Sequence, residues 1–181
     1  MAPYTLFPPL IRPARATDMA SVREIYGHYV ETSCATFEDV VPSEGEMIGR
    51  WQAVVERHLP FLVIEDAGTV LGFAYAAPFR QRSGYRYTLE DSIYLAPAAS
   101  GRGLGRRLLA DLIGHCEVLG FRQMVAVIGD SANLASIRLH ASLAFRPAGV
   151  LSAAGFKFAR WIDSVYMQRP LGDGDRSLPV F

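Results

Sequence analysis

The sequence predicts an α/β domain built on a mixed β-sheet that contains one parallel strand pair. Its 181 residues are enough for one well-buried core and too few to expect two, and half of them are apolar. Segments with helical spacing of apolar residues alternate with short apolar runs typical of strands. A strand–helix–strand unit between residues 87 and 128 implies a parallel pair joined by a right-handed crossover.

The N-terminal segments are predicted to form a strand followed by two helices. Residues Leu10–Arg15 open the sheet as a short strand. Thr17 is a good N-cap for a helix that runs to about Ser33, where apolar residues recur at helical spacing. A second helix is expected to begin at Ser43, since Ser43 and Glu46 form a capping box.

Three strands are predicted in the centre of the chain. Phe61–Glu65 and Val70–Ala76 are apolar runs on either side of Asp66-Ala67-Gly68-Thr69, which has the composition of a hairpin turn. Tyr87–Leu95 is a further strand, and Pro97 closes it.

The C-terminal half is predicted to alternate between helices and strands. A helix from Gly103 ends at Gly120, which suits the position just past a helix end. Met124–Ile128 is apolar without alternation, as expected of a strand covered on both faces. A helix over Asn133–Leu143 precedes two strands, at Ala148–Leu151 and Ser164–Arg169. The predicted order is β-α-α-β-β-β-α-β-α-β-β.

Composition argues against several classes of protein. Eighteen basic residues balance eighteen acidic ones, so the net charge gives no reason to expect nucleic acid or an anionic membrane as partner. Cys34 and Cys116 fit no metal-ligand spacing, which indicates no metal and a reduced, cytoplasmic setting. The N-terminus MAPYTLFPPL lacks the pattern of a signal peptide, and no apolar run reaches the roughly 18 residues that span a bilayer. Both termini are expected to fray around a core of residues 10–171.

The sharpest local feature is the glycine loop Ser100-Gly101-Arg102-Gly103-Leu104-Gly105-Arg106, between a predicted strand and a helix. Glycines let the backbone turn tightly and leave its N–H groups uncovered. Those groups, together with the positive end of the following helix dipole, form a cradle for a phosphate or pyrophosphate. Arg102, Arg106 and Arg107 add positive charge. The alternative is a plain glycine-rich turn.

Three kinds of phosphate site use such loops. A P-loop ATPase requires a Lys after the glycines, and this loop has none. A dinucleotide-binding fingerprint requires G-x-G-x-x-G near the start of a βαβ unit, whereas the spacing here is G-x-G-x-G and several elements precede it. The third kind is the pyrophosphate loop of acetyltransferases.

Six segments, in order, carry a resemblance that covers Ile11 to Leu171. They are Thr36-Phe37-Glu38, Thr88-Leu89-Glu90-Asp91-Ser92-Ile93-Tyr94, the glycine loop, Ile128-Gly129-Asp130-Ser131-Ala132-Asn133, Ser136-Ile137-Arg138-Leu139-His140, and Gly155-Phe156-Lys157-Phe158-Ala159-Arg160-Trp161-Ile162-Asp163. The chain resembles the GNAT superfamily of acetyl-CoA-dependent N-acetyltransferases, and within it the phosphinothricin and methionine sulfoximine acetyltransferase branch.

The resemblance implies a single N-acetyltransferase domain over residues 1–181, with a mostly antiparallel, twisted sheet whose parallel pair lies at the cofactor site. It also implies a homodimer, because the branch is dimeric. Three positions depart from the family pattern. Ser100 stands where the superfamily usually has Arg or Gln. Ala144 and Ala159 stand where the branch commonly has Gly, so each places a methyl group where the backbone calls for close approach or positive φ.

Acetyl transfer to an amine requires a neutral amine, and a free amine is mostly protonated at neutral pH. Glu90 matches the branch's proposed base, and its alternative is a solvated edge-strand carboxylate. Neighbouring Asp91 points to the opposite face of a regular strand. At His140 many GNAT enzymes place a tyrosine that protonates the leaving sulfur; here the histidine either donates a proton or lines the site.

The same resemblance implies the residues that bind acetyl-CoA. Backbone groups of Ile93, Tyr94 and Leu95 pair with the pantetheine arm, and Asn133 both caps its helix and touches that arm. The full expected set is Ile93, Tyr94, Leu95, Gly101, Arg102, Gly103, Leu104, Gly105, Arg106, Asn133 and Ser136.

Substrate recognition is expected at the segment 78–87 and near Phe37. Arg82 and Tyr85 resemble branch residues that contact the acidic end of the substrate, and an Arg fork suits a carboxylate or phosphinate. Phe37 closes the apolar side of the pocket, and Lys157 or Trp161 completes it. The alternatives are solvated loop residues for the arginine and a core position for Phe37.

The sequence therefore predicts an enzyme that acetylates the amino group of a small amino-acid-like substrate such as phosphinothricin, methionine sulfoximine or methionine sulfone. Two rivals stay open. One is a protein or peptide N-acetyltransferase, and the other is a non-catalytic acyl-CoA-binding sensor on the same fold.

Overall fold

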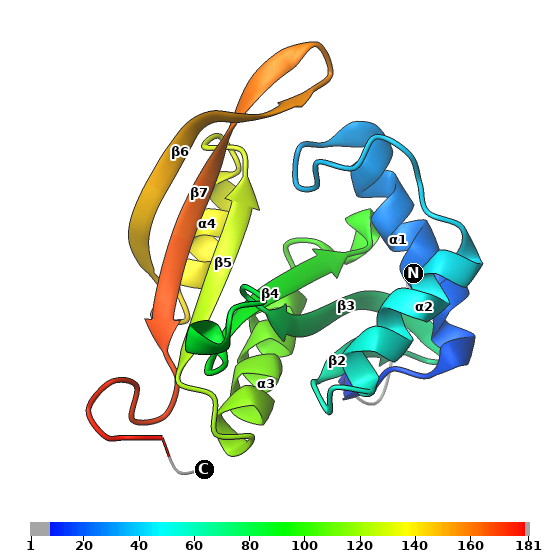
Figure 1. The fold of residues 1–181 in the computed structure, drawn as a ribbon. Helices are drawn as coiled ribbons and strands as arrows, with labels where there is room; N and C mark the ends of the chain where they lie inside the picture. The colour runs from blue at the N-terminus through cyan, green and yellow to red at the C-terminus, as the bar shows by residue number, and fades with distance from the viewer. Residues whose placement is uncertain (1–7, 180–181) are drawn as a thin grey trace.

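The structure is a computed structural model that describes residues 8–179. Seven strands form one sheet in the order β1-β2-β3-β4-β5-β7-β6, and every neighbouring pair is antiparallel except β4–β5 (Figure 1). The strands are β1 (Leu10–Pro13), β2 (Phe61–Asp66), β3 (Thr69–Pro78), β4 (Thr88–Leu95), β5 (Gln123–Gly129), β6 (Arg146–Lys157) and β7 (Arg160–Pro170). The helices are α1 (Met19–Thr32), α2 (Glu44–Val55), α3 (Leu104–Val118) and α4 (Leu134–Ala141). The predicted element order and the mixed α/β fold are confirmed.

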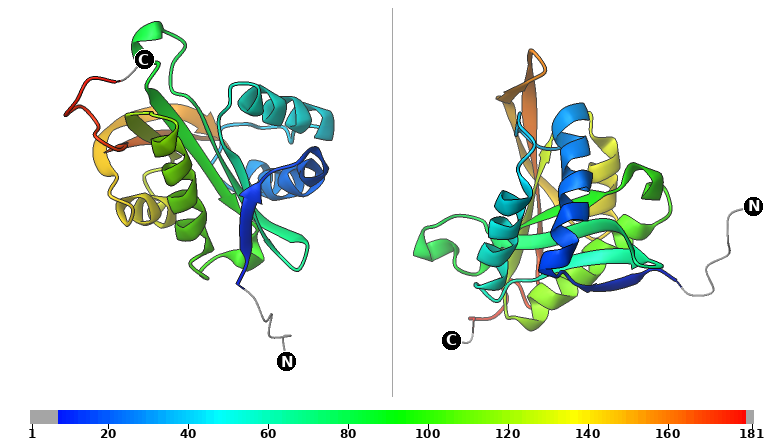
Figure 2. Two further views of the ribbon diagram at one scale, coloured as in Figure 1. Left: turned by 90° about the horizontal axis from the view of Figure 1, so that it is seen from below. Right: turned by 90° about the vertical axis from the view of Figure 1, so that its right-hand side faces the viewer.

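Helices cover both faces of the sheet. Helices α1 and α2 lie on one face, and α3 and α4 lie on the other (Figure 2). The core between these layers includes fully buried Met19 from α1, Phe73 from β3, Leu108 and Leu112 from α3, and Met124 from β5. Among residues 8–179, no helix is long and apolar enough to cross a membrane.

The parallel pair is short, and its two strands then separate. Strands β4 and β5 pair only from Thr88↔Gln123 to Asp91↔Ala126, although β4 continues to Leu95 and β5 to Gly129. Figure 1 shows the two strands spreading apart beyond this pairing. The far halves of both strands keep their outer neighbours, β3 and β7, and leave an open gap in the middle of the sheet.

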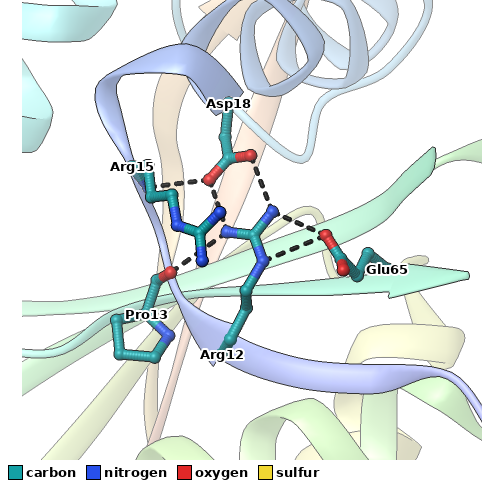
Figure 3. Close-up of polar contacts among 5 residues, drawn as sticks. All are labelled: Arg12, Pro13, Arg15, Asp18 and Glu65. Atoms are coloured by element: carbon teal, nitrogen blue, oxygen red, sulfur yellow. Dashed lines mark hydrogen bonds and ion pairs between the residues drawn. The ribbon is translucent and has the colours of Figure 1, made fainter. Parts of the chain in front are cut away.

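The start of α1 differs from the prediction. Thr17 is not its N-cap: residues 16–18 form a 3₁₀ turn, and the helix begins after Asp18. The Asp18 carboxylate accepts hydrogen bonds from the backbone N–H of Arg15, at 2.7 Å, and from the Arg12 guanidinium, at 2.7 and 2.9 Å (Figure 3). Arg12 also bonds Glu65 on β2. Arg12 thus links the start of the helix to a residue far away in the sequence, and its hydrogen bond to Asp18 lowers the pKa of that carboxyl.

The helix ends predicted at Ser43 and Gly120 are confirmed. The Ser43–Glu46 capping box forms, with the Ser43 N–H donating to Glu46 at 2.7 Å and the Glu46 N–H donating to the Ser43 hydroxyl at 3.2 Å. Gly120 follows the end of α3 with φ of 82°, the left-handed conformation expected there. Ala144 and Ala159, which stand at the expected glycine positions, have φ of 65° and 56°.

The C-terminal hairpin is much longer than the two short strands predicted. Strands β6 and β7 are joined by Phe158 and Ala159, both at positive φ, as in a two-residue hairpin turn. The turn was missed because Phe-Ala lacks the Asn-Gly signal. Strand β6 was predicted too short. Its first nine residues are all exposed, and a strand exposed on both faces does not need the alternation of apolar and polar residues by which strands are predicted.

The expected fraying concerns residues 1–9 and 172–181, of which 1–7 and 180–181 lie outside the described residues. Within the described part of the tail, Arg122 donates to the Ser177 hydroxyl and to the Leu178 carbonyl, both at 3.1 Å.

The positive φ of Ala144 leads to a stability prediction. An L-residue in the left-handed region is strained by about 1–2 kcal/mol, so Ala144→Gly is expected to raise the free energy of unfolding by about 1 kcal/mol. Ala110→Gly, at an exposed position inside α3, is the matched control and is expected to lower it by about 1 kcal/mol. Urea unfolding of the three proteins measures both changes, and a loss of stability in both variants would contradict the prediction.

Candidate active site

A cavity of about 550 Å³ occupies the gap between β4 and β5. Its wall includes tyrosines of α1, the segment 34–37, both strand edges, the glycine loop and one side of α4. Because it touches helices from both layers, the cavity runs through the sheet. Its volume lies within the usual range for small-molecule and cofactor sites.

At one end, the glycine loop leads into the N-terminus of α3. Gly101 and Gly103 have φ of 75° and 74°, and Gly103 is the N-cap residue. No heavy atom lies within 4 Å of a Cβ built at either glycine, so their backbone is open to the cavity side. The N–H groups of the first turn and the helix dipole therefore provide an anion cradle. Ser100, Leu104, Gly105 and Arg106 also line the cavity.

Only one of the three loop arginines, Arg106, lines the cavity. The Arg102 guanidinium lies 3.8 Å from the Asp66 carboxylate, and the Arg107 guanidinium donates to the Pro9 carbonyl at 2.8 Å. Two of the three arginine side chains therefore contact other residues and do not line the cavity.

In the middle of the cavity, the walls are strand edges. Ile93, Tyr94 and Leu95 of β4 lie opposite Val127, Ile128 and Gly129 of β5, without pairing between the strands. Backbone N–H and C=O groups that would complete a parallel ladder are therefore open to an extended ligand.

Asn133 ties α4 to this gap. Its side-chain oxygen accepts from the Ser136 N–H at 3.2 Å, and its amide group donates to the Gly129 carbonyl at 3.2 Å. The predicted cap is confirmed, and both Asn133 and Ser136 line the cavity.

Glu90 lies where β4 and β5 begin to separate. It is half-buried and lines the cavity. Burial raises the pKa of Glu90 and the neighbouring charge of Asp91 adds to this, while Arg80 opposes it. A carboxylate with a raised pKa is a stronger base than an exposed one.

His140 of α4 and Asp91 of β4 contact each other in the cavity wall. His140 Nε2 lies 3.0 Å from Asp91 Oδ2, and both residues are buried and line the cavity. The expectation that Asp91 points away from Glu90 does not remove it from the site, since the cavity reaches both faces of the sheet.

The other end of the cavity is lined by Phe37, which is 40% exposed. A Cβ added to Gly129 or Gly155 would lie 2.9 or 2.8 Å from the Phe37 ring, so both positions need glycine for the ring to pack there. The Tyr26 and Thr36 hydroxyls, 2.7 Å apart, lie beside it in the wall.

The remaining predicted substrate residues do not line the cavity. Lys157 is buried and donates to the carbonyls of Ser33 and Thr36, both at 2.9 Å, so it holds the segment that carries Phe37. Burial also lowers the pKa of Lys157. Arg82, Tyr85 and Trp161 are exposed.

Sequence reasoning missed several polar groups at the Phe37 end. Tyr26 and Tyr29 fit the apolar stripe of α1, and their hydroxyls were not read as cavity groups. Tyr75 and Ser92 also line the cavity, as cross-strand partners on β3 and β4. The available signal was the number of hydroxyl-bearing residues on these otherwise apolar faces. Among residues 8–179, no cluster of three or more His, Cys, Asp or Glu side chains could hold a metal ion.

Comparisons with known proteins agree with this architecture. Residues 22–145 match the acetyltransferase (GNAT) family. A phosphinothricin N-acetyltransferase from Alcaligenes faecalis is 52% identical over 169 residues, covering 93% of this chain and 86% of the relative. An L-methionine sulfoximine/L-methionine sulfone acetyltransferase from Salmonella typhimurium is 40% identical, covering 90% of this chain and 95% of the relative. A crystal structure of a GNAT superfamily phosphinothricin acetyltransferase from Sinorhizobium meliloti, in complex with AcCoA, has a TM-score of 0.93 at 46% identity and covers 96% of this chain and 94% of that one.

The glycine loop provides a matched test of the anion cradle. Gly103→Val is expected to raise the KM for acetyl-CoA at least tenfold, because a branched side chain at positive φ displaces the N–H groups of the first turn. Gly120→Val, at φ of 82° beyond the other end of α3, carries the same backbone strain away from the cavity and is expected to leave this KM unchanged. Steady-state kinetics of both variants, with unfolding curves as a check, decide the assignment. Equal KM values would mean that the cradle lies elsewhere.

Proposed function

The chain belongs to the acetyltransferase (GNAT) family, and we propose that it is a cytoplasmic, acetyl-CoA-dependent N-acetyltransferase of small amino-acid-like substrates. The proposed acceptors are phosphinothricin, methionine sulfoximine and methionine sulfone. The observation that carries the proposal is one cavity that joins an anion cradle at α3 to a half-buried carboxylate, Glu90, through an open strand edge. Two buried, unpaired cysteines are in keeping with a reducing compartment.

The residues present fit acetyl-CoA. The α3 N-terminus suits its pyrophosphate, and the free edges of β4 and β5 suit the amides of its pantetheine arm. Acetyl-CoA, when bound, supplies an activated acetyl thioester. We propose that Ile93, Tyr94, Leu95, Gly101, Arg102, Gly103, Leu104, Gly105, Arg106, Asn133 and Ser136 bind it, with Arg102 contributing its backbone.

Glu90 is the proposed general base. Its carboxylate takes a proton from the acceptor's ammonium group, directly or through water, and so produces the neutral amine that can attack. Its half-buried position in the cavity wall supports this role. His140 is the proposed second participant, since a protonated imidazole beside the cavity places positive charge near the reacting group. This chemistry requires no metal.

Acceptor recognition is proposed for the end lined by Phe37. The Phe37 ring packs against the acceptor's apolar stem, and Lys157 acts through the backbone segment it holds. Arg82 and Tyr85, exposed on the segment before β4, are the proposed contacts for the acidic end, which a guanidinium fork can bind with two hydrogen bonds.

Two relatives, at 52% and 40% identity, are named for phosphinothricin and for methionine sulfoximine or methionine sulfone, which favours a small molecule over a polypeptide as the acceptor. A non-catalytic sensor does not require a base, whereas Glu90 lines the cavity where β4 and β5 begin to separate. Thiol release from acetyl-CoA with a panel of amino-acid analogues and peptides separates all three functions.

We also propose a homodimer formed through the β6–β7 hairpin. Strand β6 is the edge of the sheet, and an unpaired edge with exposed apolar side chains is suited to association with a second copy. Five large apolar residues of this hairpin are more than half exposed: Val150, Leu151, Phe156, Phe158 and Trp161.

The dimer proposal is tested by placing a charge on that surface. Trp161→Glu is expected to convert a dimer of wild-type chains into a monomer, because it buries an unpaired carboxylate in the interface. Val118→Glu, at a position 90% exposed on α3, is the control and is expected to stay dimeric. Light scattering at micromolar concentration measures the mass. A wild-type monomer would rule the proposal out.

The base is tested by Glu90→Gln, which keeps the side chain's shape but cannot accept the amine proton. At neutral pH, kcat/KM is expected to fall by about 10²–10⁴, with little change in the KM for acetyl-CoA. The loss is expected to shrink as the pH rises, because more of the amine is then neutral without help. In the wild type, activity is lost on acidification through the raised pKa of Glu90, at higher pH than for an ordinary glutamate. A variant within about threefold of wild type at every pH would make Glu90 structural.

A further inference from the structure

The His140 ring is hydrogen bonded at both of its nitrogens. Nδ1 lies 2.8 Å from the Ser136 carbonyl oxygen of its own helix, and Nε2 lies 3.0 Å from Asp91 Oδ2 on β4. The ring is 2% exposed, and Phe145 packs against it edge to face, with ring centres 5.0 Å apart. The ring therefore has a fixed orientation and joins α4 to β4.

These partners decide where the ring protons are. A backbone carbonyl oxygen only accepts, so Nδ1 carries a proton. An ionised Asp91 also only accepts, so Nε2 carries a second one. A ring that donates at both nitrogens is an imidazolium. Burial alone disfavours that charge, but the hydrogen bond to Asp91 and its negative charge outweigh burial and raise the pKa of His140.

Two other titratable groups interact with the charge of Asp91. Burial, with the Asp91 charge adding to it, raises the pKa of Cys116 on α3 to about 12, so this thiol is neutral at physiological pH. Glu90 precedes Asp91 on β4, and the Asp91 charge contributes to its raised pKa. Neither group provides a positive charge, and His140 is the basic side chain in contact with Asp91.

The second oxygen of Asp91 is buried without a hydrogen-bond donor. Asp91 is 6% exposed and lines the cavity, yet its Oδ1 has no hydrogen-bond partner within residues 8–179. A carboxylate that served only the fold is expected to have both oxygens satisfied, because a buried acceptor without a donor is destabilising. A buried carboxylate that keeps one oxygen unsatisfied, in a residue that lines the cavity, therefore indicates a role for Asp91 beyond the fold.

We propose that Asp91 is a positioning residue for acetyl transfer: it fixes His140 as an immobile imidazolium in the cavity wall and leaves Glu90 to accept the amine proton. This inference rests on the proposed function of the cavity. A ring with both N–H groups engaged has no lone pair for the amine's proton. Its fixed positive charge stabilises negative charge that develops during acyl transfer, without any reorganisation of the ring.

The protonation of His140 is measurable without turnover. In nitrogen NMR spectra of ¹⁵N-histidine-labelled protein, the His140 signals are assigned by their absence in His140→Gln, and exposed His28, His58 and His115 supply reference signals. Both His140 nitrogens are expected to be protonated at pH 7 in the wild type. In Asp91→Asn the ring is expected to lose one proton above about pH 6.5. A wild-type ring with a bare nitrogen at pH 7 would overturn the proposal. The result stands whether or not amino-acid analogues prove to be acceptors.

A double-mutant cycle separates a positioning role of Asp91 from a general structural role. Asp91→Asn is expected to lower kcat roughly tenfold or more, with the KM for acetyl-CoA changed less than about twofold. On a His140→Gln background, the same substitution is expected to have no further effect, because Asp91 acts through the ring. Losses that multiply in the double variant would show that Asp91 acts independently and would refute the proposal. If Asp91→Asn does not fold, the wild-type spectrum still decides the state of the ring.

Discussion

The site depends on the point at which β4 and β5 stop pairing. Four residue pairs hold the parallel strands together, and the ladder ends at Asp91 and Ala126. Beyond it, the backbone groups of two strand edges face a cavity instead of each other. Each strand leads to a helix whose N-terminus lies at the same gap, α3 through the glycine loop and α4 through Asn133. A fully paired sheet would remove the cavity, the open edges and the access to Glu90 and Asp91 together.

Much of the fold could be predicted because its signals are local. The capping box at Ser43, the glycine after α3 and the loop at Gly101–Gly105 each act within a few residues, and each is present in the structure. The start of α1 could not be predicted this way. It depends on Arg12, which joins Asp18 to Glu65, a residue 53 positions away in the chain. The full length of hairpin β6–β7 was not predicted, because its turn lacks Asn-Gly and its exposed strand lacks the alternation of apolar and polar residues.

The two ends of the candidate site also differ in how far local sequence predicts them. The glycine-loop end is formed largely by one continuous segment, so its residues could be proposed from spacing and family resemblance. The acceptor end is assembled from α1, the segment after it, β3, β4 and the C-terminal hairpin. Residue type alone did not reveal that Lys157 would be buried against two carbonyls, or that His140 would pair with Asp91. Both outcomes depend on which strands are neighbours, and that information is spread over the whole chain.

The contacts of Phe37 have a consequence for how acceptor choice can change. Its ring lies against Gly129 and Gly155, and Lys157 on the same hairpin holds the backbone beside it. In the proposed acceptor site, the position of the hairpin therefore helps to set the width of the Phe37 end, together with the residues that touch the acceptor. On this proposal, a partner bound to the outer edge of β6 that displaces the hairpin also alters the fit of the acceptor, and by thermodynamic reciprocity the acceptor alters the affinity for that partner. For the proposed dimer, assembly and acceptor selectivity are thus coupled.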